Sequence, residues 1–325
     1  MSRVACLSNS TGQMDPIPSV TVVIPTYNAA GFIEETLRSV LGQTFGDFEV
    51  IVIDDGSTDE TCSIASAMGA KVRVLKQKRA GVCVARNRGL HEARGRYICF
   101  LDHDDVWHRE KLSRQLEAFD RDPDLALIHT HMLRWHEDTA GGYPPSQTLF
   151  EEHPSTELDA DQSGWAYHHL LVDSFILTST AMMRVDAVRE VGAFDPALPY
   201  SEDWDLWLRL SRKWRFAKLR GAFALYRQHR LQGSRVHRDI DYRTQLLERA
   251  VATWGLASPD GQSHGARAVW RRIGLFHAGY GLDCLRAGDL SRATHAFLRA
   301  WRCDPLQPKY LAYVAAGRLG WRPTW

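Results

Sequence analysis

Four short apolar runs in the first hundred residues constrain the fold of this chain most strongly. The first of them is short, apolar and rich in β-branched residues, which is typical of a strand buried on both faces of a sheet. After the first run, apolar residues recur at helical spacing from Phe32 to Leu41. Strands that alternate with helices predict an α/β fold with a mostly parallel sheet covered by helices. The runs are SVTVVIP at 19–25, FEVIVID at 48–54, KVRVLKQ at 71–77 and RYICFLD at 96–102.

Acidic residues gather where two of these strands end. Asp54 and Asp55 close the second run, and Asp102, Asp104 and Asp105 follow the fourth. In parallel α/β sheets, ligands bind at the carboxyl ends of the strands. We therefore expect the functional site at this edge of the sheet.

Composition excludes several classes of protein. Of 325 residues, 44% are apolar and 24% charged, ordinary values for a globular chain with a buried core. The net charge of +1 predicts no general attraction to nucleic acid. The six cysteines form neither a metal-ligand pattern nor a disulfide framework, and no run reaches the roughly 18 apolar residues of a membrane span. With residues 1–18 interpreted as a flexible leader, not a secretory signal, we expect a cytoplasmic protein.

The sequence Asp102-His103-Asp104-Asp105 sets several carboxylates close together. Like charges at this spacing repel, so they require a cation or shifted pKa values. A hard divalent ion with oxygen ligands, Mg²⁺ or Mn²⁺, suits them and would bridge to a diphosphate. The alternative is a solvated turn in which an aspartate caps the next helix.

Four motifs in a fixed order point to one family. They are VVIPTYN at 22–28, IDDGSTD at 53–59, the segment from Ala85 to Trp107, and SEDWDLWLRL at 201–210. Over residues 19–235 the chain resembles the family 2 glycosyltransferases, an inverting family with the GT-A fold. A late stretch, Tyr226 to His229 followed by Ser234, also resembles a family signature.

The resemblance implies roles for the aspartates after the strands. Asp104 would be the main metal ligand, and Asp102 would lie beside the nucleotide ribose or the metal. Asp55 would contact the nucleobase, on which Tyr27 can stack, with Pro25 shaping the same wall. The alternative for Asp54 and Asp55 is a turn and N-cap pair.

Three further residues are candidates. The family places its catalytic base on the aspartate of the Glu202-Asp203 pair, here Asp203, which would deprotonate the acceptor hydroxyl. The alternative is an acidic pair favoured by the dipole at a helix N-terminus. Arg86 either lines the diphosphate pocket or binds Asp102 structurally. His229 either completes the metal shell or is an ordinary surface or core histidine.

The sequence divides the protein into three parts. We expect a leader at 1–18, a catalytic GT-A domain at 19–238 and a helical extension at 239–325, in which 274–307 matches one tetratricopeptide repeat. A lone repeat cannot form a solenoid, so it predicts a helical hairpin that packs on another surface. Residues 265–325 hold ten Lys or Arg against three Asp. This excess predicts peripheral contact with the inner face of the membrane. The alternative is a tail that only packs on the catalytic domain.

These features together predict a metal-dependent inverting glycosyltransferase. It would move a sugar from a nucleotide-diphospho-sugar donor to a hydroxyl on a glycan or lipid-linked acceptor, in surface polysaccharide or glycoconjugate assembly. A non-catalytic nucleotide-sugar-binding scaffold and a two-carboxylate glycoside hydrolase are the alternatives. A dinucleotide oxidoreductase is disfavoured because no G-x-G-x-x-G follows the first strand.

Overall fold

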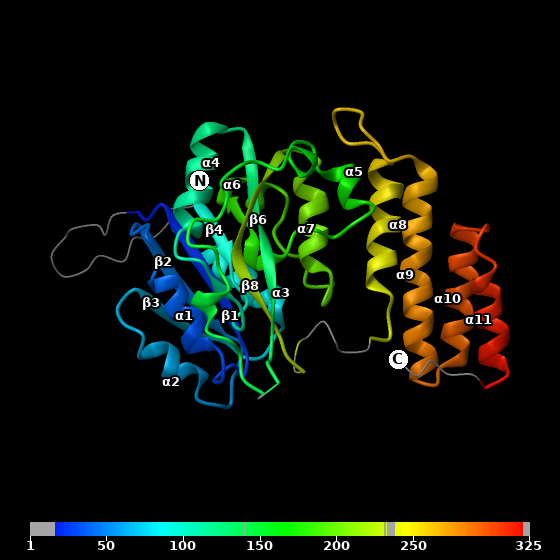
Figure 1. Cartoon of the computed structure of the whole chain (residues 1–325), viewed down its shortest axis with the longest axis horizontal. Coiled ribbons are helices and arrows are strands. Elements are labelled where there is room, and N and C mark those ends of the chain that lie inside the picture. Colours follow the sequence, from blue (N-terminus) through cyan, green and yellow to red (C-terminus); the bar gives the residue numbers. More distant parts are fainter. Residues whose placement is uncertain (1–16, 140, 231, 233–237, 321–325) are drawn as a thin grey trace.

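The computed structural model describes residues 17–139, 141–230, 232 and 238–320, as an α/β part followed by a row of helices (Figure 1). Most of the predicted leader, and Ser234 of the late signature, lie outside the described residues. The α/β fold and the helical extension are both confirmed.

A single eight-stranded sheet forms the centre of the α/β part, in the order β3-β2-β1-β4-β7-β6-β8-β5. The first four strands pair in parallel, as predicted. The other half of the sheet is mixed. Strand β7 runs antiparallel to both β4 and β6, and β5 runs antiparallel to β8, whereas β6 and β8 are parallel to each other. The strands are β1 Val20–Thr26, β2 Phe48–Asp54, β3 Val72–Lys76, β4 Tyr97–Phe100, β5 Val106–Trp107, β6 Leu125–His136, β7 Met182–Arg184 and β8 Arg215–Gln228.

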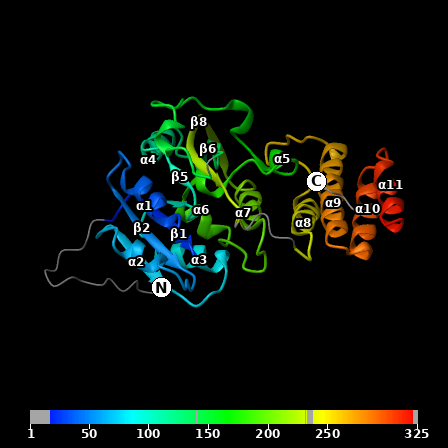
Figure 2. The ribbon, with the colours of Figure 1, turned by 60° about the horizontal axis from the view of Figure 1, so that its bottom comes forward.

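Helices cover both faces of this sheet (Figures 1 and 2). In the α/β part they are α1 Ile33–Leu41, α2 Thr61–Ser66, α3 Val82–Glu92, α4 Lys111–Arg121, α5 Tyr167–Leu170, α6 Val185–Glu190 and α7 Glu202–Leu210. Short 3-10 helices lie at η1 Ser146–Thr148, η2 Ala160–Gln162 and η3 Thr178–Thr180.

The buried strands divide their side chains between two cores, as the period of two in a strand requires. In β1, Val23 packs with one core, whereas Val22 and Ile24 pack with the other on the opposite face. Helix α3 lies so close to β1 that a Cβ on Gly89 would stand 2.2 Å from a methyl of Val23. This contact fixes α3, and with it Arg86, against the first strand.

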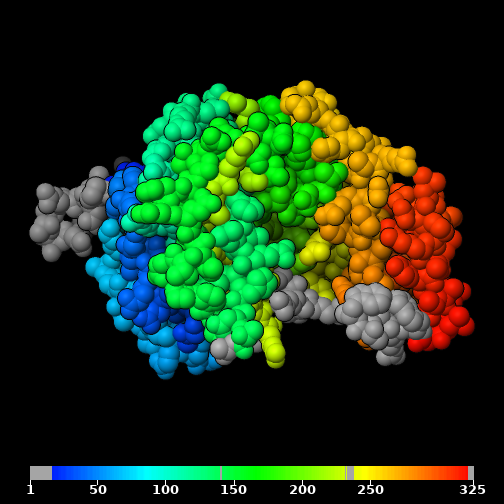
Figure 3. All heavy atoms as spheres, viewed as in Figure 1, coloured from blue at the N-terminus to red at the C-terminus, as the bar shows by residue number. Residues whose placement is uncertain are grey.

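The C-terminal region consists of α8 Tyr242–Trp254, α9 Ala266–Arg286, α10 Leu290–Cys303 and α11 Lys309–Arg318, which stack side by side (Figures 1 and 2). Helices α9 and α10 are the predicted hairpin, in which a Cβ on Gly281 would stand 2.8 Å from the ring of Phe297. Leu246 of α8 and Ile273 of α9 belong to the same core as Trp204 and Trp207 of α7. The extension therefore packs on the α/β part, and the space-filling view shows the two in direct contact (Figure 3). Residues on both sides of the predicted boundary at 238/239 therefore belong to one continuous core.

Among the described residues, no helix is both long and apolar enough to cross a membrane.

Candidate active site

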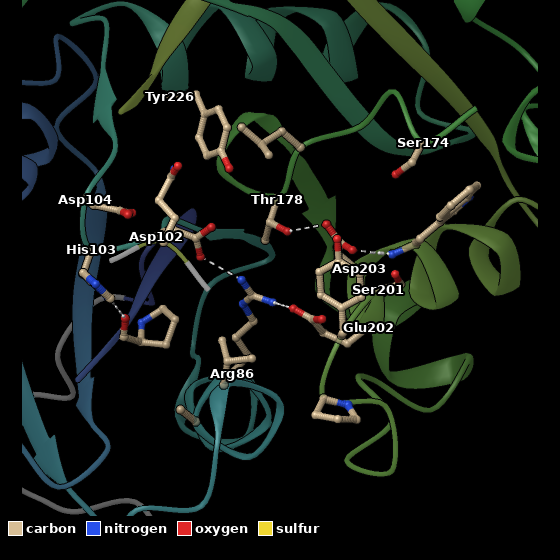
Figure 4. Close-up of a pocket in the computed structure, with 18 of the residues that line it drawn as sticks. Arg86, Asp102, His103, Asp104, Ser174, Thr178, Ser201, Glu202, Asp203 and Tyr226 are labelled. Carbon is tan, nitrogen blue, oxygen red and sulfur yellow. Dashed lines mark hydrogen bonds and ion pairs between the residues drawn. The ribbon is translucent and has the colours of Figure 1, made fainter. Parts of the chain in front are cut away.

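A cavity of about 680 Å³ opens at the carboxyl ends of the first strands (Figure 4). It lies between the loops that follow β1, β2 and β4 on one side and helix α7 on the other, and the start of the C-terminal extension closes its rim. Every site residue predicted from the sequence lines this one cavity. They are Pro25, Tyr27, Asp55, Arg86, Asp102, Asp104, Asp203 and His229.

Asp55 organises one end of the cavity. Its carboxylate accepts hydrogen bonds from Nε2 of Gln77 and from the backbone N–H groups of Ala80 and Gly81, each at 2.8 Å. These bonds hold the loop between β3 and α3, and they leave part of the acceptor capacity of the two oxygens for a ligand. Asp54 instead accepts from the N–H of Ser57, as expected for a turn.

Tyr27 lies beside this loop with one face already covered. The guanidinium of Arg79 stacks over its ring, 4.0 Å from the centroid. The partly exposed ring offers its other surface to the cavity, so a planar base can stack there within an Arg–Tyr pair.

Arg86 connects the two acidic motifs across the cavity floor. Its guanidinium contacts Oδ1 of Asp102 at 2.7 Å and Oε1 of Glu202 at 2.6 Å (Figure 4). The side chain is only 4% exposed. Burial lowers the pKa of Arg86, but the charges of Asp102 and Glu202 outweigh it and raise the pKa overall. Of the two roles left open by the sequence, the ion pair with Asp102 is present, and Arg86 also reaches the cavity wall.

Glu202 and Asp203 are neighbours with different environments. Glu202 is engaged by Arg86, whereas Asp203 accepts a hydrogen bond from Oγ1 of Thr178 at 3.1 Å and one from the N–H of Trp204 at 2.7 Å. Burial, reinforced by the charge of Glu202, raises the pKa of Asp203 to about 6, although Arg86 opposes the shift. A carboxylate with this pKa is suited to accept a proton near neutral pH.

The metal candidates Asp104 and His229 meet at the other end of the cavity. Nε2 of His229 lies 2.7 Å from Oδ2 of Asp104, and both side chains are mostly buried. Burial raises the pKa of Asp104, but the hydrogen bond with His229 and the charge of His103 outweigh it and lower the pKa. Asp104 therefore stays ionised at neutral pH.

Asp105 has a structural role, and its side chain does not line the cavity. Its carboxylate is fully buried and contacts Oγ of Ser179 and the N–H of Arg227. Burial, together with the charges of Asp104 and Asp102, raises its pKa well above the usual range. The acidic motif is thus divided between residues that face the cavity and one that braces its wall.

Comparison with known sequences decides the family. The sequence profile described as Glycosyl transferase family 2 matches residues 21–191, more than half of the chain. The chain belongs to glycosyltransferase family 2.

Related sequences match parts of the chain. The uncharacterized glycosyltransferase RP339 of Rickettsia prowazekii (strain Madrid E) is 30% identical over 197 residues, which are 60% of this chain and 59% of that protein. The chain therefore spans less than two thirds of that relative's length. The putative teichuronic acid biosynthesis glycosyltransferase TuaG of Bacillus subtilis (strain 168) is 43% identical over 104 residues, 31% of this chain and 41% of TuaG.

Solved structures share the fold of the glycosyltransferase. A crystal structure of S. aureus TarS in complex with UDP-GlcNAc superposes with a TM-score of 0.63 at 19% identity, covering 93% of this chain and 92% of that one. The mannosyltransferase PcManGT from Pyrobaculum calidifontis, in complex with GDP-Man and Mn²⁺, gives a TM-score of 0.56 at 18% identity, covering 93% and 86%. Both confirm the GT-A architecture.

The side chains of Asp104 and His229 are of a kind that fits a hard divalent ion. They supply a carboxylate oxygen and an imidazole nitrogen side by side at the edge of the cavity. Mg²⁺ and Mn²⁺ are usually held by one or two carboxylates, with substrate phosphates and water in the other positions.

Several residues of the site lie outside the sequence predictions. Thr178, on η3, orients Asp203, and no local pattern marks it. Asn28 has a positive φ of 47° and accepts a hydrogen bond from the N–H of Thr58, so it joins the loops after β1 and β2. An asparagine directly after a strand is a signal that could have found it, because Asn tolerates this backbone conformation.

Arg86→Lys tests the link between the acidic motifs. An ammonium cannot contact Asp102 and Glu202 with the same fork, so one buried carboxylate loses its charged partner. We expect the free energy of unfolding to fall by about 2 kcal/mol, the typical value of a hydrogen bond to a charged group. Urea denaturation measures this change. Arg88→Lys, on the same helix but bonded at the surface to the carbonyl of Lys76, is the matched control and should change stability by less than about 0.5 kcal/mol.

Proposed function

We propose that the enzyme transfers a sugar from a nucleotide-diphospho-sugar to an acceptor hydroxyl, with inversion at the anomeric carbon and with a divalent metal. The observation that carries the proposal is that Glu202 and Asp203, although neighbours, have different partners. Arg86 engages Glu202, so Asp203 faces the cavity with a pKa of about 6 and no ion pair among the residues described. In a single displacement, one base suffices, because no covalent intermediate forms.

In this proposal, each end of the cavity binds a different part of the donor. Tyr27 and Asp55 would bind the base of the donor, and Asp102 would lie beside the ribose or the metal. Asp104 and His229 would hold Mg²⁺ or Mn²⁺, which would neutralise charge on the departing diphosphate. Asp203 would take the proton of the acceptor hydroxyl as that oxygen attacks the anomeric carbon. Thr178 would keep the Asp203 carboxylate in position through its hydrogen bond.

A panel of nucleotide-diphospho-sugars, each with and without Mn²⁺, tests the proposal. A donor that binds the native state raises the melting temperature by mass action. The same mixtures are assayed for released nucleoside diphosphate with candidate acceptors. Binding without turnover would favour a nucleotide-sugar-binding scaffold, and metal-independent sugar release from a glycan would favour a hydrolase. Lack of stabilisation by every donor would refute the proposal.

Helices α8 and α9 bring arginine and aromatic side chains to one side of the cavity, where Arg272 is paired with Asp173 at 3.0 Å. Arg243 and Arg272, from α8 and α9, line it together with Tyr200 and Phe276. Arg243 donates a hydrogen bond to the hydroxyl of Tyr200, and the guanidinium of Arg272 lies 4.6 Å from the Phe276 centroid. Aromatic rings suit the apolar face of a sugar, and guanidinium groups suit phosphate or carboxylate. The acceptor we propose is therefore a glycan or lipid-linked glycan that carries negative charge.

Arg243→Ala tests this side of the cavity. We expect KM for an anionic acceptor to rise about tenfold, equivalent to about 1.4 kcal/mol, with KM for the donor unchanged. Arg267→Ala, on α9 but outside the cavity, is the control and should leave both constants unchanged. Equal effects of the two substitutions would contradict an arginine-specific acceptor site.

Peripheral membrane contact stays a proposal for the extension. Apolar side chains are exposed near basic residues on α10, in the turn before α11 and just after α11: Trp301 is 37%, Leu306 69% and Leu319 88% exposed. Such a surface can lie on anionic lipid, where each basic residue adds about 1 kcal/mol. The aromatic and basic residues at 321–325 lie outside the described residues.

A flotation assay measures this contact. The full chain should float with anionic vesicles at low salt and not with neutral ones. Replacing Lys309 and Arg318 together by Glu should reduce recovery severalfold, whereas Lys71→Glu, on the remote side of the sheet near Phe48, should not. Equal recovery of all three proteins would leave the extension a purely packing element.

A further inference from the structure

Three histidines meet where the C-terminal extension joins the catalytic part, away from the active-site cavity. His168 and His169 lie on the short helix α5, and His264 lies on the loop between α8 and α9. One ring nitrogen of each falls within a group whose members are all within 4.8 Å of one another. We propose that this histidine cluster is a second metal site, which binds Zn²⁺ and joins the extension to the catalytic part.

The three imidazole rings lie close enough together to share one cation. Nε2 of His264 lies 3.0 Å from Nδ1 of His169, and the rings of His168 and His169 have centroids 3.9 Å apart. Between two neutral imidazoles, a single proton can fill such a nitrogen–nitrogen contact, but the third ring adds another lone pair to the same space. Tetrahedral zinc with histidine ligands is a natural occupant of three converging imidazole nitrogens.

The cluster is open to solvent on one side. His168 is 5% exposed, whereas His264 is exposed, so an ion can enter from the solvent side.

Outer groups orient the ligands in the manner of known zinc sites. Nδ1 of His168 lies 2.7 Å from Oγ of Ser258, which itself lies 3.4 Å from the carbonyl of Trp165. If the imidazole N–H donates to Ser258 and the hydroxyl donates to Trp165, Nε2 of His168 is left free for the metal. Such a second partner fixes the tautomer and ring orientation of a ligating histidine.

Nearby carboxylates supply the missing negative charge. Asp260, on the same loop as His264, interacts electrostatically with both His168 and His169, and Asp161 of η2 interacts with His169. Their negative charge favours a cation at the cluster. Water would occupy the fourth position of the tetrahedron.

The loop that carries His264 is already fixed on the catalytic part. The hydroxyl of Tyr167 donates to the carbonyl of Gly255 at 2.9 Å, and Arg212 donates to the carbonyl of Ala257 at 2.6 Å. The ligands are therefore brought together before any ion binds, and the ion would add a bond between the two parts of the chain. This inference does not depend on the proposed transferase activity.

Zinc binding by the full chain, prepared without a histidine tag, tests the site. After removal of metal with a chelator, we expect one tightly bound Zn²⁺ per chain and a melting temperature that rises with Zn²⁺. Loss of an outer-shell partner typically costs about 10–100-fold in metal affinity, so His264→Ala and His169→Ala, which remove ligands, should cost more than about 100-fold. Both residues are at least partly exposed, so the variants should remain folded.

Two controls separate this site from other histidines and from the catalytic metal. His295→Ala, an exposed histidine on α10, and Asp104→Ala should both keep the tight Zn²⁺. Zinc affinity that is unchanged in His264→Ala and His169→Ala would overturn the proposal. Loss of the tight Zn²⁺ in Asp104→Ala would do the same, because it would place the ion in the active site.

Discussion

Asp203→Asn is expected to retain donor binding and to lower turnover by about 10²–10⁴-fold, the usual contribution of a positioned base. Asparagine preserves the shape of the side chain and can still meet Thr178, so the loss is confined to the proton acceptor. Removing a buried charge whose pKa is raised also predicts a melting temperature at pH 7.5 that is equal or higher. Steady-state kinetics and nucleotide-sugar binding measure the two effects, and normal turnover would eliminate Asp203 as the base.

The pH profile checks the same assignment. The pKa of Asp203 is about 6, so the residue is ionised above this pH and its basic form is lost as pH falls. In the wild type, kcat/KM should decrease about tenfold per pH unit below 6. The residual activity of Asp203→Asn should lack this acidic limb.

Asp205→Asn is the matched control on the same helix. Its carboxylate contacts Arg209 at 2.7 Å and Arg249 at 2.5 Å, and it does not line the cavity. This substitution should lower the melting temperature and leave turnover near that of the wild type. Asp203→Asn would then lower turnover without lowering the melting temperature, whereas Asp205→Asn would lower the melting temperature without lowering turnover.

The sequence predicted the first half of the fold well because its signal is local. Strands β1, β2 and β4 are mainly apolar and buried along their length, and each is followed within a few positions by polar residues. A parallel sheet brings such turns to one edge, so Asp55, Asp102 and Asp104 could be placed together from order alone. In the folded chain, all three residues line one cavity.

The second half was less predictable because its contacts are distant along the chain. Strand β8, Arg215–Gln228, pairs along its length with β6, which lies far away in the sequence. Arg86 and Glu202 are separated by 116 positions, and nothing near either residue announces their ion pair. The pairing nevertheless decides which carboxylate of the Glu-Asp pair can act as a base.

The acidic motif shows the same limit within four residues. A run of aspartates predicts repulsion, but not which members face a ligand. Asp104 contacts His229 at the cavity, whereas Asp105 contacts Ser179 in the wall. The difference comes from the direction of adjacent side chains and from what β8 and η3 place opposite them, which only the folded chain determines.

Asp104→Ala is expected to reduce transfer by about 10³-fold or more, because a metal at the departing diphosphate provides several kcal/mol of stabilisation in the transition state. The residue lies in the turn after β4 and its carboxylate bonds to His229, so the fold should survive the substitution. Titration of UDP and GDP, with and without Mn²⁺, measures the cause directly. In the wild type, Mn²⁺ should raise the affinity for the nucleoside diphosphate that matches the donor. In the variant, this response should disappear.

His229→Gln divides the metal corner further. Glutamine keeps a polar side chain beside Asp104 but removes the imidazole nitrogen that lies 2.7 Å from its carboxylate. If His229 is a ligand, the Mn²⁺ response should weaken by more than about 100-fold, in the same direction as in Asp104→Ala, whereas an outer partner that only positions Asp104 should cost about 10–100-fold. An unchanged response would show that His229 takes no part in metal binding. An undiminished Mn²⁺ response in Asp104→Ala itself would refute the metal assignment, because Asp104 is the ionised carboxylate at this end of the cavity.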